Sequence, residues 1–151
     1  MCGRFFLADS DNSGELRSII DQLNRRGVTV KTGEILPTDT VPVLANNRNR
    51  RVMPFSMQWG YTLPDGRLLI NARSETAGEK PLFQDAMRQH RCLIPAMNYF
   101  EWEKRGREKI KYAIRQADAG LLYMAGLYRV ENGRAVFTIL TREPAEQIRF
   151  I

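Results

Sequence analysis

From residue 52 onward, the chain consists largely of short apolar segments separated by turn residues. These segments are rich in β-branched and aromatic side chains, and glycine, proline, asparagine or aspartate stands between them, a pattern that is typical of strands joined by tight turns. We therefore expect a chain built mainly from short strands. The segments are residues 52–61, 68–73, 91–104, 109–116, 121–130 and 134–141.

Two of the connections carry a hairpin signal. Asn132-Gly133 stands between the last two segments and suits a type I′ turn, because asparagine and glycine adopt positive φ at little cost. The run Lys-Arg-Gly-Arg at 104–107 predicts a second hairpin. Residues 35–43 contain Pro37 and Pro42, which predict an extended loop or an edge, because proline cannot donate to a sheet ladder.

Two segments have helical periodicity. Residues 13–27 place apolar side chains at i, i+3, i+4 and i+7 and end at Gly27, a natural stop. Residues 80–90 begin with Pro81, which suits a first helical turn, and carry an apolar face that includes the single histidine, His90. With no repeat or linker, the sequence predicts one β-rich α+β domain over residues 1–151 with a few peripheral helices.

The charge balance favours a polyanionic partner. Lys and Arg number 23 against 17 Asp and Glu, which gives a formal net charge of +6 and a pI of about 9.7. Each phosphate that such a protein neutralises releases counterions, so nucleic acid is a natural ligand. Charge alone leaves the alternative of a basic protein that binds no nucleic acid.

The remaining composition argues against several classes. No apolar run approaches the roughly 18 residues of a membrane span, and polar residues arrive too early for a signal peptide, so we expect no membrane partner. The two cysteines, Cys2 and Cys92, predict a reducing compartment rather than a disulfide framework, hence a cytoplasmic protein, nucleoid-associated in a bacterium. With only His90 besides them, we expect no metal site and no cofactor.

Cys2 follows the initiator methionine directly. Aminopeptidases remove Met1 before a small residue, so we expect an α-amine and a thiol on one Cα. The amine has an ordinary pKa of roughly 7.7–8.0 and the thiol about 8.5, so both are nucleophilic near neutrality. The amine can form a Schiff base with an aldehyde, and the adjacent thiol can close a five-membered thiazolidine. The alternative is that Cys2 is incidental. Cys92 begins an apolar strand segment, and we interpret it as a core residue.

Polar residues in two strand segments are further candidates. Asn71 and Arg73 alternate and so share a face, where they suit a sugar or carbonyl oxygen and a phosphate. Glu101 lies between Phe100 and Trp102, opposite to both rings, and suits proton transfer. In each case, the alternative is a solvated strand residue.

Aromatic and basic residues interleave along the chain in the way that single-strand binders use to stack bases and follow phosphates. The basic run at 104–111 either lines such a groove or forms a solvated hairpin, and each aromatic residue is alternatively part of the core. The interleaved residues are Arg4, Trp59, Tyr61, Arg73, Tyr99 and Trp102.

Taken together, four segments resemble the SOS response-associated peptidase (SRAP) family in content, order and spacing. They are Met-Cys-Gly-Arg-Phe at 1–5, Trp-Gly-Tyr at 59–61, Ile-Asn-Ala-Arg-Ser-Glu-Thr at 70–76 and Phe-Glu-Trp at 100–102. The resemblance covers essentially the whole chain. It implies barrel-like antiparallel sheets with a basic groove and a protein that crosslinks to abasic sites in single-stranded DNA. The family is also linked to autoproteolytic exposure of the cysteine, whereas only Met1 precedes Cys2 here.

The resemblance also implies roles for individual residues. Cys2 would attack the ring-opened sugar, Asn71 would contact it and Glu101 would assist proton transfer. DNA-binding roles fall to a second set, in which two arginines hold phosphates, two tryptophans meet the strand and a threonine lies near the lesion. This second set is Arg4, Arg73, Trp59, Trp102 and Thr141.

The sequence departs from the family pattern in two places. The family histidine expected late in the domain would come just after Ile151, so we expect a domain truncated at its C-terminus. The loop that resembles Asn-x-Ala-Pro in the family is Ile-Leu-Pro-Thr-Asp at 35–39, without the asparagine, and its DNA contacts are not carried over.

Other functions stay open at this point. An N-terminal-nucleophile glutamine amidotransferase also begins Met-Cys-Gly, although no further motif of that class follows. A non-covalent module for single-stranded or modified DNA is the second alternative. A thiol peptidase acting on other proteins is the least favoured alternative, because the sequence offers no Cys–His pair. We expect a monomer.

Overall fold

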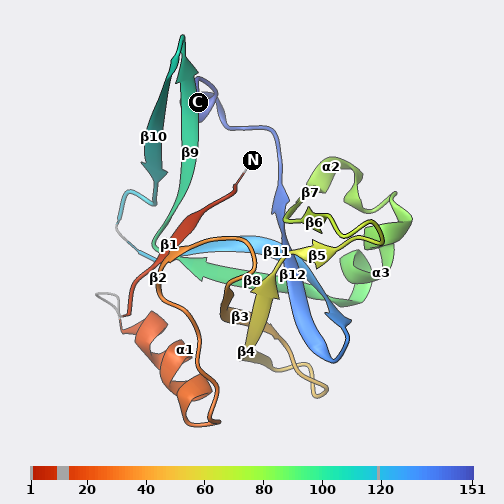
Figure 1. Ribbon diagram of the computed structural model, residues 1–151. Coiled ribbons are helices and arrows are strands. Elements are labelled where there is room, and N and C mark those ends of the chain that lie inside the picture. Colours follow the sequence, from red (N-terminus) through yellow and green to blue (C-terminus); the bar gives the residue numbers. More distant parts are fainter. Residues whose placement is uncertain (1, 10–13, 119) are drawn as a thin grey trace.

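The centre of the molecule is a closed five-stranded β-barrel (Figure 1). The computed structural model describes residues 2–9, 14–118 and 120–151. Strands follow the order β11-β8-β3-β4-β12 around the barrel, and β12 pairs back with β11 to close it. Closure leaves no free barrel edge. The strands are β3 (Thr40–Asn46), β4 (Val52–Trp59), β8 (Arg91–Ala96), β11 (Leu122–Glu131) and β12 (Arg134–Thr141).

A second sheet of four antiparallel strands, in the order β10-β9-β1-β2, lies against the barrel. Its long β9–β10 hairpin projects from the body of the molecule, and the N-terminus lies between this hairpin and the barrel (Figure 1). The second sheet therefore brings the start of the chain to the junction of the two sheets. Its strands are β1 (Phe5–Leu7), β2 (Gly33–Ile35), β9 (Asn98–Arg105) and β10 (Glu108–Ile114).

Both predicted hairpins are confirmed. Asn132 and Gly133 have φ values of 49° and 76°, the left-handed pair that a type I′ turn between β11 and β12 requires. Gly106, with φ 63°, turns the chain between β9 and β10. The β-rich α+β prediction and its barrel-like character are confirmed as well.

Three predicted segments each divide between two sheets. Residues 52–61 break at Gly60, whose φ of 117° ends β4 before β5 (Tyr61–Thr62). Residues 68–73 divide into β6 (Leu68–Leu69), which pairs with β5, and β7 (Asn71–Arg73), which runs parallel to β12. Residues 91–104 divide at Met97 into β8 and β9. An apolar run does not reveal where a strand leaves one sheet for another, because both sheets bury the same kinds of side chain.

The prediction of a loop or edge around Pro42 is wrong in part. Pro42 lies in β3, between β4 and β8 in the barrel. However, the ladder with β8 comprises only Leu44 and Ala45, so Pro42 pairs with β4 alone, opposite Ser56. Locally it has one neighbouring strand, as proline requires.

The helices are peripheral, as predicted. The first, α1 (Glu15–Asn24), buries Leu16, Ile19 and Leu23; the predicted start at residue 13 lies outside the described residues. The second, α3 (Pro81–Gln89), begins at the predicted proline. A short helix, α2 (Ser74–Ala77), and a 3-10 turn, η1 (Glu146–Ile148), were not predicted. No helix in the described ranges is long and apolar enough to cross a membrane.

Candidate active site

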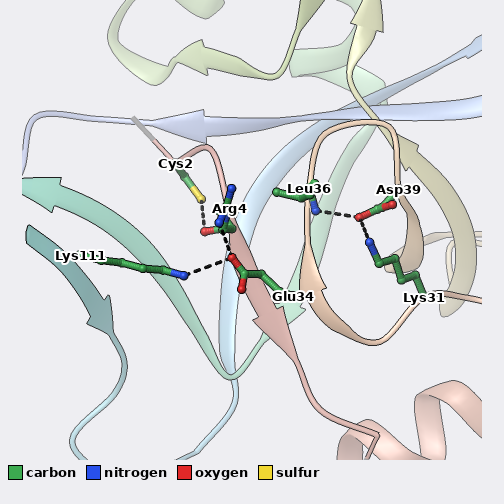
Figure 2. Close-up of polar contacts among 7 residues, drawn as sticks. All are labelled: Cys2, Arg4, Lys31, Glu34, Leu36, Asp39 and Lys111. Carbon is green, nitrogen blue, oxygen red and sulfur yellow. Dashed lines mark hydrogen bonds and ion pairs between the residues drawn. The ribbon is translucent and has the colours of Figure 1, made fainter. Parts of the chain in front are cut away.

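Cys2 lies just ahead of β1, at the junction of the two sheets. Its side chain is only 5% exposed, and its Sγ donates to the carbonyl oxygen of Arg4 at 3.8 Å (Figure 2). Burial, with a further contribution from the negative charge of Glu101, raises the pKa of Cys2 to about 12. The thiol is therefore neutral near pH 7.

Asn71 binds the backbone of the same residue. It opens β7, opposite Ile139 of β12, and its Nδ2 donates to the carbonyl oxygen of Cys2 at 2.8 Å. The Oδ1 of Asn71 is buried and accepts no hydrogen bond within the part of the chain that the structure describes. An unused buried acceptor carries a free-energy cost unless a donor arrives, so this oxygen is suited to a ligand hydroxyl or an amine.

A cavity of about 500 Å³ opens beside Cys2. Tyr99 and Glu101 line it from β9, and Thr141 lines it from the end of β12. Cavities of this size hold small ligands or single nucleotides. The structure thus brings together Cys2, Glu101 and Thr141, with Asn71 bonded to Cys2, although these residues come from four distant parts of the chain.

Tyr99 shares the face of β9 that Glu101 occupies. Burial, and then the charges of Glu101 and Cys2, raise the pKa of Tyr99. Its hydroxyl is therefore neutral at any physiological pH. The sequence placed Tyr99 among the interleaved aromatics but not at this cavity, although its i, i+2 spacing to Glu101 was a usable signal.

On the opposite face of β9, Trp102 meets Arg4, the residue before β1, and both are predicted to bind DNA. The guanidinium of Arg4 lies 5.5 Å from the centre of the Trp102 ring. Its Nη1 is 2.6 Å from Oε1 of Glu34, a partner that sequence reasoning missed (Figure 2). The prediction that Glu101 points away from Phe100 and Trp102 agrees with this geometry, since the two rings share a face with Lys111.

Comparisons with known proteins identify the family of the chain. The family described as SOS response associated peptidase (SRAP) matches residues 1–151. The chain belongs to the SRAP family. It is 30% identical to the abasic site processing protein YoaM of Bacillus subtilis over the whole of this chain and 71% of the relative. It is 29% identical to the abasic site processing protein YedK of Escherichia coli over 84% of this chain and 59% of that protein.

Solved structures share the SRAP fold. A crystal structure of a protein from Bacteroides thetaiotaomicron superposes with a TM-score of 0.73 at 22% identity. The superposition covers 99% of this chain and 72% of that protein. A phage-related protein from Bordetella bronchiseptica has a TM-score of 0.69 at 22% identity, over 94% and 70% of the two chains. At these identities, the likeness shows the fold alone.

Arg73 of this SRAP domain is exposed and ion-paired. It lies in register with Thr141, and its guanidinium contacts the carboxylates of Glu143 and, at 3.7 Å, Glu75. A DNA phosphate that binds Arg73 would therefore compete with these two acidic side chains. Neither carboxylate was singled out from the sequence. Glu143 lies 70 residues from Arg73, so local sequence does not reveal that ion pair, whereas Glu75 lies only two residues away.

Trp59, which is predicted to contact DNA, has no exposed surface. Its ring is fully buried, 5.3 Å from Phe5 and 6.3 Å from Phe137, and its Nε1 donates to the carbonyl oxygen of Ile70 at 3.0 Å. A ring with no exposed surface cannot stack on a base, so in this structure Trp59 is a core residue. The sequence could not decide this, because tryptophan serves both purposes.

The second cysteine and the histidine lie elsewhere. Cys92 is buried in β8, as predicted. His90 packs against Tyr128, with its Nδ1 3.3 Å from a carboxylate oxygen of Asp85, and does not line the Cys2 cavity. Among the described residues, no group of three or more metal-binding side chains gathers at one place.

Proposed function

We propose that this protein captures abasic sites in single-stranded DNA covalently through Cys2 once Met1 is removed. One observation carries the proposal: Cys2 lies at a nucleotide-sized cavity that Glu101 and Thr141 also line, and Asn71 is bonded to its carbonyl oxygen. Two relatives are named abasic site processing proteins, which supports the choice of lesion.

The chemistry begins with the amine. The ring-opened abasic sugar presents an aldehyde, and the α-amine nitrogen adds to its carbon to give a carbinolamine. Loss of one water then leaves a Schiff base. The amine acts first because its ordinary pKa of roughly 7.7–8.0 leaves a useful free fraction at pH 7, whereas burial keeps the thiol of Cys2 protonated.

The thiol acts second. Its sulfur adds to the imine carbon and forms a C–S bond, while the thiol proton is transferred to the imine nitrogen. Ring closure therefore neither adds nor releases an atom. Glu101 lines the same cavity and is the group we assign to carry this proton. Closure is intramolecular, which gives it a high effective molarity and makes the adduct stable.

Intact-mass spectrometry tests the proposal directly. After incubation with an oligonucleotide whose single uracil has been removed by a glycosylase, we expect the chain without Met1 to gain the oligonucleotide mass less one water. The same oligonucleotide with its uracil in place is the control. An unchanged protein mass with the abasic strand would refute the proposal, and so would an adduct that a retained N-terminal extension does not diminish.

The non-covalent alternative has one observation in its favour. Trp102 and Phe100 lie beside the cations of Arg4 and Lys111, an arrangement that binds single strands without chemistry. Equal affinity for intact and abasic strands, with no adduct, would select this function instead.

A further inference from the structure

Two cations beside Cys2 converge on a single carboxylate oxygen. Nη1 of Arg4 lies 2.6 Å from Oε1 of Glu34, and Nζ of Lys111 lies 3.1 Å from the same atom (Figure 2). The hydrogen bond from Lys111, and then that from Arg4, hold the pKa of Glu34 below its usual range. Glu34 is therefore a carboxylate at neutral pH.

The cluster is assembled by the second sheet rather than by local sequence. Glu34 lies in β2, opposite Phe6 of β1, whereas Lys111 lies in β10, opposite Trp102 of β9. Arg4 comes immediately before β1. Three separate parts of the chain thus supply the two cations and the anion.

Aromatic rings hold both cations in place. Nζ of Lys111 lies 3.9 Å from the centre of the Phe100 ring and 5.8 Å from that of Trp102, and the guanidinium of Arg4 lies 5.5 Å from the latter. A cation over an aromatic face is attracted by the ring quadrupole. The side chains of Arg4, Glu34 and Lys111 are nonetheless 36%, 40% and 38% exposed, so a solute can reach them.

The backbone connects this cluster to Cys2. The carbonyl oxygen of Arg4 accepts both the Sγ of Cys2 at 3.8 Å and the N–H of Phe100 at 2.9 Å. A group bound by the Arg4 side chain is thus held two residues from the reacting amine. Proteins also bind phosphate oxygens in this way, with an arginine and a lysine donating to the same oxygen.

We propose that Arg4 and Lys111 form one phosphate subsite for the DNA strand and that Glu34 occupies its anion position in the free protein, so that a DNA phosphate binds by displacing Glu34. Lys111 is thereby a further DNA-binding residue, and Glu34 a residue that weakens non-covalent binding. That the phosphate belongs to DNA rests on the proposed function.

The consequence is a lower affinity for intact DNA. Two cations and one carboxylate leave the cluster with a single net positive charge, whereas the cations alone would carry two. Non-covalent affinity for undamaged strands is reduced accordingly. Lasting attachment to DNA then depends on the covalent step at an abasic site.

Replacing the carboxylate tests the competition. We expect Glu34→Gln to bind an intact oligothymidylate about threefold more tightly at low salt, the scale of one exposed ion pair. Because about 0.7 of a counterion is released per phosphate neutralised on a single strand, the plot of log K against log salt should steepen by about 0.7. Asp85→Asn is the matched control, since it removes an exposed carboxylate that pairs with His90 instead. Unchanged or weaker binding by Glu34→Gln, or an equal gain in Asp85→Asn, would overturn the inference.

Replacing the lysine gives an independent test. Lys111→Gln should weaken binding about threefold and make the salt slope shallower by about 0.7. Lys109→Gln, two residues earlier on the same exposed strand, is the control and should have a smaller effect. If the two variants behave alike, Lys111 has no special role and the subsite is refuted.

The intact strand has no aldehyde, so these measurements report the subsite without the covalent step. Adduct yield on an abasic strand is measured separately. Adduct formation together with unaltered Glu34→Gln binding would refute the subsite alone, and altered binding without an adduct would refute the covalent function alone.

Discussion

Cys2 and Cys92 are equally buried and equally protonated, yet only Cys2 lines the cavity beside β9 and β12. Each side chain is 5% exposed, and burial raises the pKa of each thiol to about 12. Cys92 packs inside the barrel, where a Cβ on Gly126 would lie 3.1 Å from its Sγ. Cys2 lines a cavity and stands next to the start of the chain. The proposed reactivity of Cys2 therefore depends on access to the cavity and on the neighbouring amine, not on thiol acidity.

The largest expected difference between the two cysteines is in covalent capture. Cys2→Ala should lose the heat-stable adduct completely, because no thiazolidine can close, whereas Cys92→Ala should retain it. Borohydride should still trap an imine with Cys2→Ala, because that variant keeps its α-amine. Denaturing gels of abasic-strand reactions measure both. A stable adduct in Cys2→Ala would show that the two thiols do not differ in the way described.

The next largest effect concerns the carboxylate that only Cys2 has nearby. Glu101→Gln should slow adduct formation about 10²-fold, the lower range for a general acid–base group. Glu103→Gln on the same strand, whose carboxylate instead bonds the hydroxyl of Tyr112, is the matched control. Single-turnover rates measure the effect, and equal rates for the two variants would remove Glu101 from the mechanism.

The rate of alkylation at alkaline pH should distinguish both cysteines from an ordinary thiol. A variant at Glu101 should then distinguish Cys2 from Cys92. With a pKa of about 12, the thiolate fraction of Cys2 rises about tenfold per pH unit from pH 7 to pH 9, so the rate of alkylation by iodoacetamide should rise likewise without levelling off.

Glu101→Gln removes a negative charge that raises this pKa. The variant should therefore speed alkylation of Cys2 but not of Cys92, whose pKa only burial raises. Peptide mapping by mass spectrometry distinguishes the sites. A plateau near pH 8.5 would contradict the raised pKa.

The smallest effect is on stability. Cys92→Ala should lower the free energy of unfolding by about 1 kcal/mol, because it removes one buried atom from a packed barrel. Cys2→Ala should cost less, since its side chain borders a cavity. Urea denaturation measures both, and a greater loss for Cys2→Ala would make Cys2 the structural cysteine.

Local sequence determined several of the elements and their turns. Positive φ at Asn132 and Gly133, the start of α3 at Pro81 and the alternation that sets Glu101 opposite to Trp102 all followed from residue type and spacing. These features depend on the conformational preferences of a few adjacent residues, and those preferences follow from residue type alone. The Met-Cys-Gly-Arg-Phe start likewise pointed to the amine and thiol of Cys2.

Tertiary structure alone decided which residues meet. The burial of Trp59, the switch of sheet at Met97 and the convergence of Arg4 and Lys111 on Glu34 each depend on pairing between strands far apart in the chain. A tryptophan fits a core as well as a surface, and an exposed glutamate carries no sign of its partner. Only closure of the barrel and docking of the second sheet choose among those options, because the free energy of burial depends on the whole packed arrangement and not on any one segment.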